Sequence, residues 1–549
     1  MDADSRPDRL RSPQWLEASR MRFLDTVKLA PRLPVLLATM LLAPDAFAGD
    51  WYVDAVHGSD SNSGASPQAA WRTITHAVTH LQAGSERILV AAGTYDVALG
   101  EVFPIEPKPG HQIIGMPGEA RPVIHGDSVV NSRLFRFVSA AGAPQFFGPD
   151  TRLENLILRR ADWGIEIRAL SGDVSPTFVN LELARLTWFG MTVFAQGGTS
   201  SPTLERSRLG TTVPTGSCGL IDCRGMSSPG ILLRVRDCQF VDNGGWAIGL
   251  RQNVDARFER CQIDSQVFAG IYASAGLNES LRLECIDTVI TNNMLPFDLQ
   301  SDRGSVYATF TRCSMGGSPS GVIAHNAHPS GSLYYSLDSC LVLTNGPLLV
   351  AGSNTQPALS RSFLSDASYA GINGCISGDA RVHDEIGGDL RLRYGSPCID
   401  AAGTDAPAGA RDAEGNLRDV DGDLDRVAHT DIGALEFRPL ELESTGERGT
   451  PLQLRSWGAP GALSTIYWTR RPLAEPTSTP FGLFLLDPDL ARVFKVTSTG
   501  YDTPTLLQRL IPNDPALIGQ SFSFQALVDS PASPIQKAFT NAVEVTVLP

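Results

Sequence analysis

Apolar and polar residues alternate in short runs through the middle of the chain, and Gly, Asn and Asp separate these runs. The strings "RLENLILR" (152–159) and "RFERCQID" (257–264) share one pattern. An apolar residue is followed three positions later by a compact residue, and two positions after that by another apolar one. Alternation with a period of two predicts short β-strands. No helical pattern of useful length interrupts residues 82–370.

The residue at the middle of this pattern recurs along the chain, and we call the set of these residues the inner column. Its nine members are Leu156, Leu181, Ser207, Cys238, Cys261, Thr288, Cys313, Cys340 and Ser362. Consecutive members are 22 to 31 residues apart. A period of this size is typical of solenoid proteins, in which each repeat forms one supersecondary unit.

A second strand follows the inner column by about ten residues in several repeats. Its strings are "GIEIRA" (164–169), "GMTVFA" (190–195), "AIGLRQ" (247–252) and "GIYASA" (270–275). Coils of short strands, stacked so that equivalent strands pair in parallel, account for both strand patterns. Parallel crossovers are almost always right-handed, which sets the hand. The sequence therefore predicts an all-β fold, a right-handed parallel β-helix solenoid.

Four members of the inner column are cysteines: Cys238, Cys261, Cys313 and Cys340. Leu, Ser and Thr share the column with them, so the position takes a compact side chain, and a free cysteine behaves as a small hydrophobe. Zinc needs four converging ligands, which a straight stack does not supply. Stacked Cβ atoms also lie slightly too far apart for an unstrained disulfide. These cysteines are predicted to pack in the core.

Residues 52–95 contain the strings "YVDAVHGSDSNSGASP", "WRTITHAV" and "AAGTY". They resemble the N-terminal module of unknown function that opens many secreted bacterial proteins of the right-handed β-helix, pectate-lyase-like superfamily. The resemblance implies a fold and export, but no single activity. Independently, a helical stripe predicts a short helix that caps the open end of the solenoid core. The stripe consists of Trp71, Ile74, Val78 and Leu81.

Residues 390–437, which begin "LRLRYGSPCIDAAG" and end "HTDIGALEF", resemble the segment that often closes such β-helices. The predicted β-helix therefore covers residues 49–437, with 49–95 as its N-terminal capping module and 390–437 as its closing segment. The capping and closing segments protect the two ends of the stacked core, as the terminal repeats of a solenoid must.

The last part of the chain, residues 441–549, differs in character. The strings "SFSFQALVD" (521–529) and "AVEVTVL" (542–548) alternate as the strands of a sandwich do. About 100 residues of short strands suit a small antiparallel β-sandwich. The segment resembles an accessory domain at the C-terminus of secreted bacterial proteins.

The beginning of the chain has the pattern of a signal peptide. Basic residues precede the apolar run "VLLATMLLA" (35–43), and "AFA" (46–48) offers small residues for cleavage. The run is too short to span a bilayer as a helix, and no later segment is a membrane-span candidate. Residues 1–48 are therefore predicted to be removed by cleavage near Ala48, leaving a secreted or extracellular protein. The net charge of −14 argues against nucleic-acid binding, which needs a basic face.

Alternating aspartates in "DVDGDLD" offer a candidate metal site: Asp419, Asp421, Asp423 and Asp425. Dense carboxylates in a loop that contains glycine suit calcium, although the glycine does not have the EF-hand spacing and no Glu closes the loop. A solvated acidic turn is the alternative. Calcium is the only cofactor that the sequence suggests.

Four cysteines outside the inner column are candidates for disulfides in an exported protein. Cys375 and Cys398 lie near the closing turns and are the more favoured bridge. Cys218 and Cys223 bracket "GLID"; only a turn there would bring their sulfur atoms together, because an extended strand would hold them apart.

Alternation along the second strand of each coil also predicts which side chains face outward. These residues mix aromatic rings, which stack on sugars, with charged groups, which bind hydroxyls and carboxylates. The candidate ligand-binding residues are Glu166, Arg168, Phe194, Arg251, Tyr272, Asp298 and His325. The alternative is that any exposed sheet carries such a mixture.

Two functions fit these patterns. The first is a secreted β-helix protein that binds a polysaccharide or another glycan of the cell envelope without catalysis. The second is a carbohydrate-active enzyme, most plausibly a polysaccharide lyase acting on acidic glycans. The strings "NTD", "GDD", "GHG" and "RIK", which mark polygalacturonase-like hydrolases, do not occur. The sequence therefore favours binding over catalysis, and fold analogy alone does not decide between them.

Overall fold

The computed structural model describes residues 49–549 with short gaps. The gaps are 128–130, 141, 143–144, 211–218, 227–229, 243, 322, 327–329, 345–354, 404–405, 499–503, 531–534 and 536. For residues 323–326, 355–357 and 495–498 only the backbone is described. The predicted signal peptide, 1–48, lies outside the described residues.

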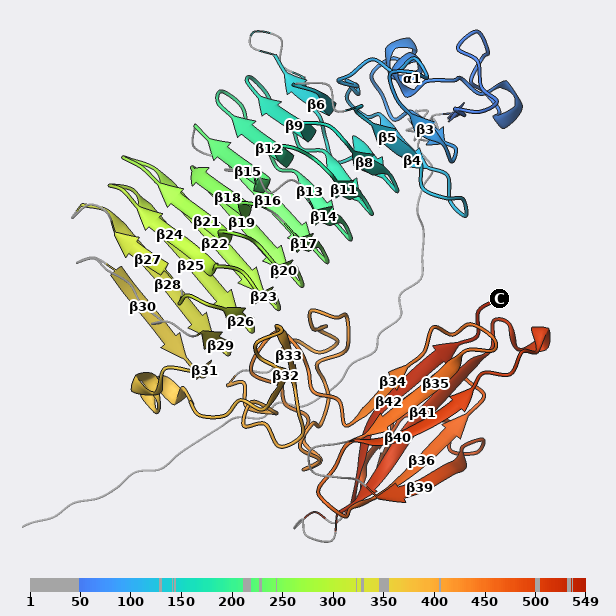
Figure 1. Ribbon diagram of the computed structural model, residues 1–549, viewed down its shortest axis with the longest axis vertical. Coiled ribbons are helices and arrows are strands. Elements are labelled where there is room, and N and C mark those ends of the chain that lie inside the picture. Colours follow the sequence, from blue (N-terminus) through green and yellow to red (C-terminus); the bar gives the residue numbers. More distant parts are fainter. Residues whose placement is uncertain are drawn as a thin grey trace, which may run out of the picture. The chain divides into compact units, whose positions relative to one another are not determined.

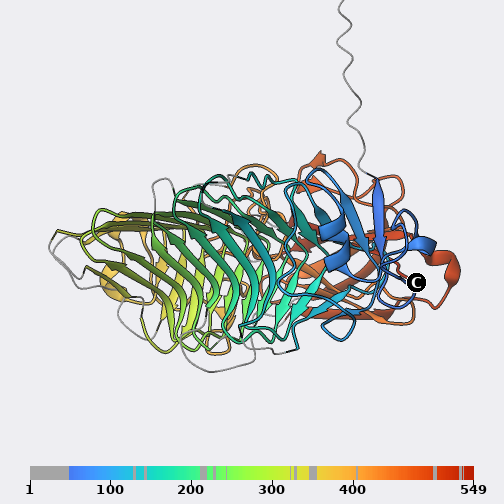
Figure 2. The same ribbon diagram turned by 90° about the horizontal axis from the view of Figure 1, so that it is seen from above.

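Three parallel sheets run along the solenoid, and each full coil contributes one strand to each sheet (Figure 1). The first sheet has twelve strands: β1 (Asp50–Val53), β2 (Arg87–Val90), β4 (Gln112–Gly115), β7 (Arg152–Glu154), β10 (Thr177–Val179), β13 (Thr203–Glu205), β16 (Ile231–Arg236), β19 (Val254–Glu259), β22 (Ser280–Ile286), β25 (Ser305–Thr311), β28 (Ser332–Asp338) and β30 (Thr355–Ser360). The coils stack in chain order, as the view from above also shows (Figure 2).

The second sheet has eleven strands: β3 (Thr94–Tyr95), β5 (Val123–His125), β8 (Ile157–Arg159), β11 (Glu182–Ala184), β14 (Arg208–Gly210), β17 (Gln239–Val241), β20 (Gln262–Asp264), β23 (Val289–Thr291), β26 (Ser314–Ser318), β29 (Leu341–Thr344) and β31 (Phe363–Leu364). The third has eight: β6 (Arg133–Ser139), β9 (Trp163–Ala169), β12 (Phe189–Ala195), β15 (Gly219–Gly225), β18 (Trp246–Gln252), β21 (Ala269–Ala275), β24 (Leu295–Ser301) and β27 (Ile323–Asn326). The predicted parallel β-helix is confirmed.

The inner column is buried along its whole length, and no member is more than 3 % exposed. Column hydroxyl groups accept the backbone N–H of the preceding column residue: Ser207 Oγ lies 3.0 Å from the nitrogen of Leu181, and Ser362 Oγ lies 3.0 Å from that of Cys340. All four column cysteines are free thiols, and burial raises the pKa of Cys261 to about 12. The predicted packing role of these cysteines is confirmed.

The residue before each column member turns the chain from the first sheet to the second. All nine have a left-handed backbone conformation, which is uncommon for residues other than glycine. Their side chains also stack: Asn180 donates to Asn155 at 3.0 Å, and further along the solenoid Arg260 pairs with Asp237 at 2.7 Å. Amide contacts and ion pairs between coils thus stabilise a turn whose backbone is strained.

The N-terminal end of the core is capped by α1 (Ile74–His80), which follows the 3-10 turn η1 (Pro67–Ala69). The hydroxyl oxygen of Thr73 accepts the N–H of His76 and caps the helix. All four residues of the predicted stripe belong to the solenoid core, although Trp71 and Leu81 flank the helix rather than lie within it. The predicted helical cap is confirmed.

The closing segment contains η2 (Ala367–Tyr369), η3 (Ile372–Gly374) and the hairpin of β32 (Val382–Asp384) and β33 (Asp389–Leu392). Its backbone and side chains contact coils of the solenoid: Gly433 donates to the carbonyl of Ser339, and Ala434 donates to Ser314 Oγ. A second small core, separate from that of the solenoid, forms here around Phe363, Leu390 and Phe437.

The predicted bridge between Cys375 and Cys398 is wrong. Both are free, buried thiols, and each belongs to a different core: Cys375 packs in the solenoid core and Cys398 packs in the closing segment's own core. Cys223 is likewise a free, buried thiol within strand β15, as an extended strand requires. Cys218 lies outside the described residues.

The C-terminal part forms two antiparallel sheets and a hairpin, as predicted for a small sandwich. One sheet consists of β34 (Leu440–Glu443), β35 (Pro451–Ser456) and β40 (Thr505–Leu510). The other consists of β39 (Arg492–Ser498), β36 (Leu463–Thr469), β41 (Ser521–Asp529) and β42 (Lys537–Thr546), and β37 (Thr477–Thr479) and β38 (Gly482–Phe484) form the hairpin. A 3-10 turn, η4 (Pro515–Leu517), precedes β41.

Candidate functional site

The outward side of the third sheet, which we call the third-sheet face, carries the residues that the sequence singled out. Period-two alternation predicts that six apolar residues of these strands point inward, and the five of them that the structure describes are at most 1 % exposed: Ile165, Met191, Ile248, Ile271 and Phe297. Val322, the sixth, lies outside the described residues. The register of the parallel strands then aligns the outward residues in two rows, one residue per coil.

The first row consists of Glu166, Thr192, Asp222, Gly249, Tyr272 and Asp298. The second row consists of Arg168, Phe194, Arg224, Arg251, Ser274 and Gln300. Six of the seven predicted ligand-binding residues therefore lie in these two rows. The seventh, His325, follows Gln300 in the register of β24 and β27, but its side chain is outside the described part.

Asp222 is the electrostatic centre of the face. Its side chain is only 6 % exposed and lies between two arginines. Arg224 Nε is 3.1 Å from one carboxylate oxygen, and an Nη atom of Arg251 is 3.3 Å from the other. The carboxylate therefore holds both guanidinium groups in place on the sheet surface.

Trp246 and Tyr272 form an aromatic platform next to this centre. Their ring centroids are 5.5 Å apart, and the guanidinium carbon of Arg251 lies 5.0 Å from the Trp246 ring and 5.8 Å from the Tyr272 ring. The indole lies flat on the sheet because the two glycines beneath it have no side chains. A Cβ atom at Gly219 or Gly249 would lie 2.5 Å from the indole nitrogen.

A second ring-and-arginine group lies at the other end of the face. The Arg133 guanidinium stacks 4.2 Å above the Trp163 ring and pairs with Glu166 at 2.8 Å. Trp188 stacks on Trp163 with centroids 6.3 Å apart. A hollow of about 250 Å³ lies on the face between this group and Asp222, and Phe194 and Arg168 line it.

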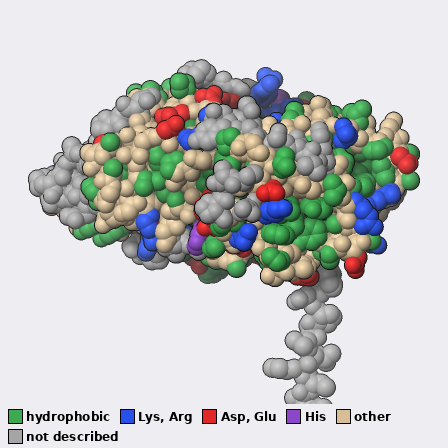
Figure 3. All heavy atoms as spheres, turned by 90° about the horizontal axis from the view of Figure 1, so that it is seen from below, with side chains coloured by type: hydrophobic (Ala, Val, Ile, Leu, Met, Phe, Trp, Pro, Cys, Tyr) green, Lys and Arg blue, Asp and Glu red, His purple; other side chains and the backbone are tan. Residues whose placement is uncertain are grey.

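On the third-sheet face, the arginine side chains are more exposed to solvent than the carboxylate side chains. The Arg224 side chain is 50 % exposed, whereas those of Glu166 and Asp222 are 14 % and 6 % exposed. Asp298 is also buried and accepts two hydrogen bonds from the Gln300 amide. On the side of the molecule drawn in Figure 3, charged side chains are scattered rather than gathered by sign. The arginines of the third-sheet face are the groups on it that can attract an anionic ligand.

Asp222, Arg224 and Trp246 belong to the site but were not predicted from the sequence. A signal was present, because "GLIDCRG" (219–225) alternates as "GIEIRA" does and pairs with it through β12. The repeat that contains it is the longest of the series, and the two nearby cysteines left open whether this stretch is an extended strand or a turn that brings their sulfur atoms together. Trp163 and Trp246 occupy the first position of their strands. Each lies one residue before a string from which the second strand was predicted, "GIEIRA" (164–169) and "AIGLRQ" (247–252).

The aspartates of the closing segment do not all converge. One carboxylate oxygen from each of Asp400, Asp421 and Asp423 lies within 4.8 Å of the others. Asp419 and Asp425 are not part of this group, and their carboxylates accept the backbone N–H groups of Gly409 and Val427 respectively. Burial raises the pKa of Asp400 to about 7 and that of Asp421 to about 6. Asp400, in "CIDAAG", was missed because it lies 19 residues before the acidic string.

Calcium binding by these aspartates remains a prediction. Millimolar calcium should raise the melting temperature by about 2–4 °C, because a ligand that binds only the folded protein stabilises it. The Asp421→Asn variant should lose this shift, and the Asp419→Asn variant should keep it. Melting curves that are the same with calcium and with chelator would instead identify the string as a solvated acidic turn.

The three parallel sheets define this chain as an all-β parallel β-helix protein, and the ring-and-arginine groups lie on the outward side of the third sheet. The family model described as "Protein of unknown function (DUF1565)" matches residues 56–128, which confirms a module of unknown function near the N-terminus and extends past its predicted end at residue 95. Among curated proteins, none matches the sequence. No helix in the described part of the chain has the length and apolar character needed to cross a membrane.

Several solved structures are similar. A pectate lyase, Pel9A, is 15 % identical, with a TM-score of 0.37 over 71 % of this chain and 96 % of its own. The GH136 lacto-N-biosidase from Eubacterium ramulus is 11 % identical, with a TM-score of 0.32 over 56 % of this chain and 68 % of its own. Tailspike protein 2 from the Escherichia coli O157:H7 bacteriophage CAB120 is 12 % identical, with a TM-score of 0.24 over 86 % of this chain and 66 % of its own. Likenesses this low carry no argument about function, which must come from the chain's own geometry.

Proposed function

We propose that the third-sheet face binds a polysaccharide chain laid across the stacked coils. The observation that carries this proposal is the repeated pairing of an aromatic ring with an arginine on successive strands. The pairs are Trp163 with Arg133, Phe194 with Arg168, and both Trp246 and Tyr272 with Arg251. Ring faces stack on the apolar faces of sugars, and a guanidinium group offers five N–H donors to hydroxyls and carboxylates.

The geometry of the solenoid suits an extended ligand. Parallel strands are about 4.8 Å apart, so the six strands from β9 to β24 present a surface about 24 Å long. An aromatic ring or an arginine lies on the outward side of each strand from β9 to β21, and the last strand, β24, carries Asp298 and Gln300. A chain of several sugar residues can therefore contact more than one pair at once, which adds affinity without requiring a deep pocket.

The charge distribution favours an acidic polysaccharide over a neutral one. The outermost charged groups are guanidinium groups, whereas the carboxylates beneath them are occupied in ion pairs with Arg133, Arg224 and Arg251. Arginine presents a planar fork of donors that matches the geometry of a carboxylate. Uronic acid units would supply such carboxylates at regular intervals along the chain.

The same ion pairs favour binding over the alternative of a polysaccharide lyase. A lyase needs a basic side chain that can accept a proton from the sugar ring. Arg224 and Arg251 both pair with Asp222. An adjacent carboxylate stabilises the protonated guanidinium, so neither arginine is poised to act as a base.

Gel retardation tests the proposal directly. The mature protein is run through gels that contain acidic or neutral polysaccharides, and absorbance monitors unsaturated product in parallel solutions with calcium. We expect retardation by acidic polysaccharides that weakens as salt is added, since exposed charges are screened. Equal retardation by neutral polysaccharides would contradict the role of the arginines, and accumulation of unsaturated product would establish the lyase alternative.

The proposed site of action is outside the cell. Polysaccharides of this kind lie at or beyond the cell envelope, and the predicted signal peptide, 1–48, would deliver the mature chain there.

A further inference from the structure

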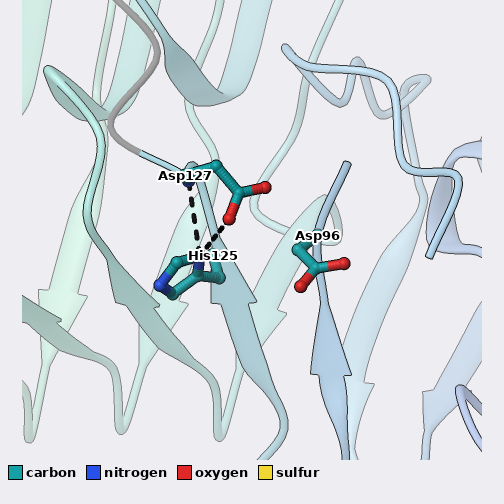
Figure 4. Close-up of side chains that lie close together, drawn as sticks. All are labelled: Asp96, His125 and Asp127. Atoms are coloured by element: carbon teal, nitrogen blue, oxygen red, sulfur yellow. Dashed lines mark hydrogen bonds and ion pairs between the residues drawn. The ribbon is translucent and has the colours of Figure 1, made fainter. Parts of the chain in front are cut away.

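Three donor groups converge at one edge of the second sheet. Asp96 follows strand β3, His125 ends strand β5, and Asp127 lies two residues further on. One ligand atom from each residue lies within 4.8 Å of the others. His125 Nδ1 is 2.8 Å from Asp127 Oδ1. Figure 4 shows the Asp96 carboxylate across a gap from this pair.

The backbone holds these groups in place. Asp96 Oδ1 accepts the N–H of Leu99 at 2.8 Å, and Asp127 Oδ2 accepts the N–H of Val97 at 3.2 Å. Gly126, between the histidine and the second aspartate, packs so closely on the next coil that a Cβ would lie 2.7 Å from the Cβ of Ala161. The two coils therefore fix the donor groups before any ligand arrives, which lowers the cost of binding.

The negative charges of Asp96 and Asp127 are not neutralised by arginines, unlike those of many other carboxylates on the solenoid. Carboxylates on the solenoid commonly pair with an arginine, as Asp222 and Asp237 do. Among the described residues, neither Asp96 nor Asp127 forms an ion pair with an arginine or a lysine, and the partner of Asp127 is His125. Two carboxylates held this close repel each other, and a bound cation relieves that repulsion.

We propose that Asp96, His125 and Asp127 bind one divalent transition-metal ion of the zinc or manganese type. An imidazole nitrogen with two carboxylate oxygens suits these ions, whereas calcium takes oxygen ligands. Ligand atoms around tetrahedral zinc are about 3.4 Å apart, so the contact between His125 and Asp127 needs to open only slightly. The side chains of His125 and Asp127 are 16 % and 35 % exposed, which leaves water free to complete the coordination.

The proposed metal site is independent of glycan binding and lies within the residues that match the family of unknown function. It would clamp the end of β3 to the end of β5, which are neighbouring strands of the second sheet. The metal therefore stabilises the N-terminal end of the solenoid.

Zinc titration by calorimetry, on mature protein without an affinity tag, tests this site in the presence of excess calcium. We expect one saturable site per chain. Asp96→Asn and His125→Gln should each weaken zinc binding by about tenfold or more, a loss of about 1.4 kcal/mol or more. Asp127→Asn should do the same without strain, because asparagine tolerates the left-handed backbone at this position, where φ is +53°.

His57→Gln is the matched control. His57 Nδ1 lies 3.1 Å from an Asp54 oxygen, but no third donor joins this pair in the described part of the chain. The control should bind zinc as the unchanged protein does. Thermal unfolding without metal establishes that each variant is folded, and dialysis followed by metal analysis gives the stoichiometry. Absence of zinc uptake, or zinc binding that survives both Asp96→Asn and His125→Gln, would overturn the proposal.

Discussion

Replacing Arg418 by methionine is expected to lower the free energy of unfolding by about 3–5 kcal/mol. The Arg418 side chain is fully buried and lies 2.9 Å from Asp287 of the solenoid and 3.1 Å from Glu436 of the closing segment. It also donates to the carbonyl of Gly433 at 3.0 Å. Removing one member of a buried ion pair leaves its partners without compensation, and here that loss loosens the closing segment from the coils.

Urea unfolding followed by circular dichroism measures this effect, and Arg391→Met is the matched control. Arg391 pairs with Asp389 in the same segment, but the two side chains are 45 % and 34 % exposed. An exposed pair of this kind contributes about 1 kcal/mol or less. Equal unfolding midpoints for the two variants would show that Arg418 does not tie the closing segment to the solenoid.

Replacing both Arg251 and Tyr272 by alanine is expected to weaken polysaccharide binding by about 100-fold. Each lost contact contributes about 1.4 kcal/mol to binding, in the range of a desolvated cation–π or stacking interaction. Asp222 keeps its ion pair with Arg224 in this variant, so the strand should remain folded. Gel retardation or calorimetry with an acidic polysaccharide measures the change.

Tyr307 and Tyr334 provide the matched control for this double variant. They stack with ring centroids 5.0 Å apart and are 43 % and 40 % exposed, but they lie on the first sheet. Replacing both by alanine removes a comparable exposed aromatic pair and should leave binding unchanged. If this control loses affinity while the Arg251 and Tyr272 variant keeps it, the ligand binds the first sheet instead.

The parts of the fold that repeat could be predicted from the sequence. The inner column was visible because its members recur in a constant setting, and period-two alternation then gave the inward and outward faces. The stacked turn residues, such as Asp237 and Arg260, were not visible. Their left-handed backbone is imposed by the turn between two sheets; Asp is compatible with that conformation, but Arg gives no indication of it.

The candidate site was predicted only in part, because its centre depends on packing across coils. Asp222 could have been found from the alternation of its strand. The position of Trp246 could not be found in this way. Its ring fits on the sheet only because Gly249 in its own strand and Gly219 in the neighbouring strand carry no side chain. The wrong bridge between Cys375 and Cys398 has a similar origin, since proximity in sequence did not reveal that the two cysteines pack in separate cores.

Hydroxyl-radical footprinting of the mature protein, with and without a bound acidic polysaccharide, tests the proposed binding face most directly. Radicals oxidise exposed aromatic side chains, and mass spectrometry locates each modified residue. The proposal predicts that Trp163, Trp188 and Tyr272 become protected when the polysaccharide binds, whereas Tyr307 and Tyr334 on the first sheet stay as reactive as before. Protection of Tyr307 and Tyr334, with Trp188 and Tyr272 unchanged, would contradict it.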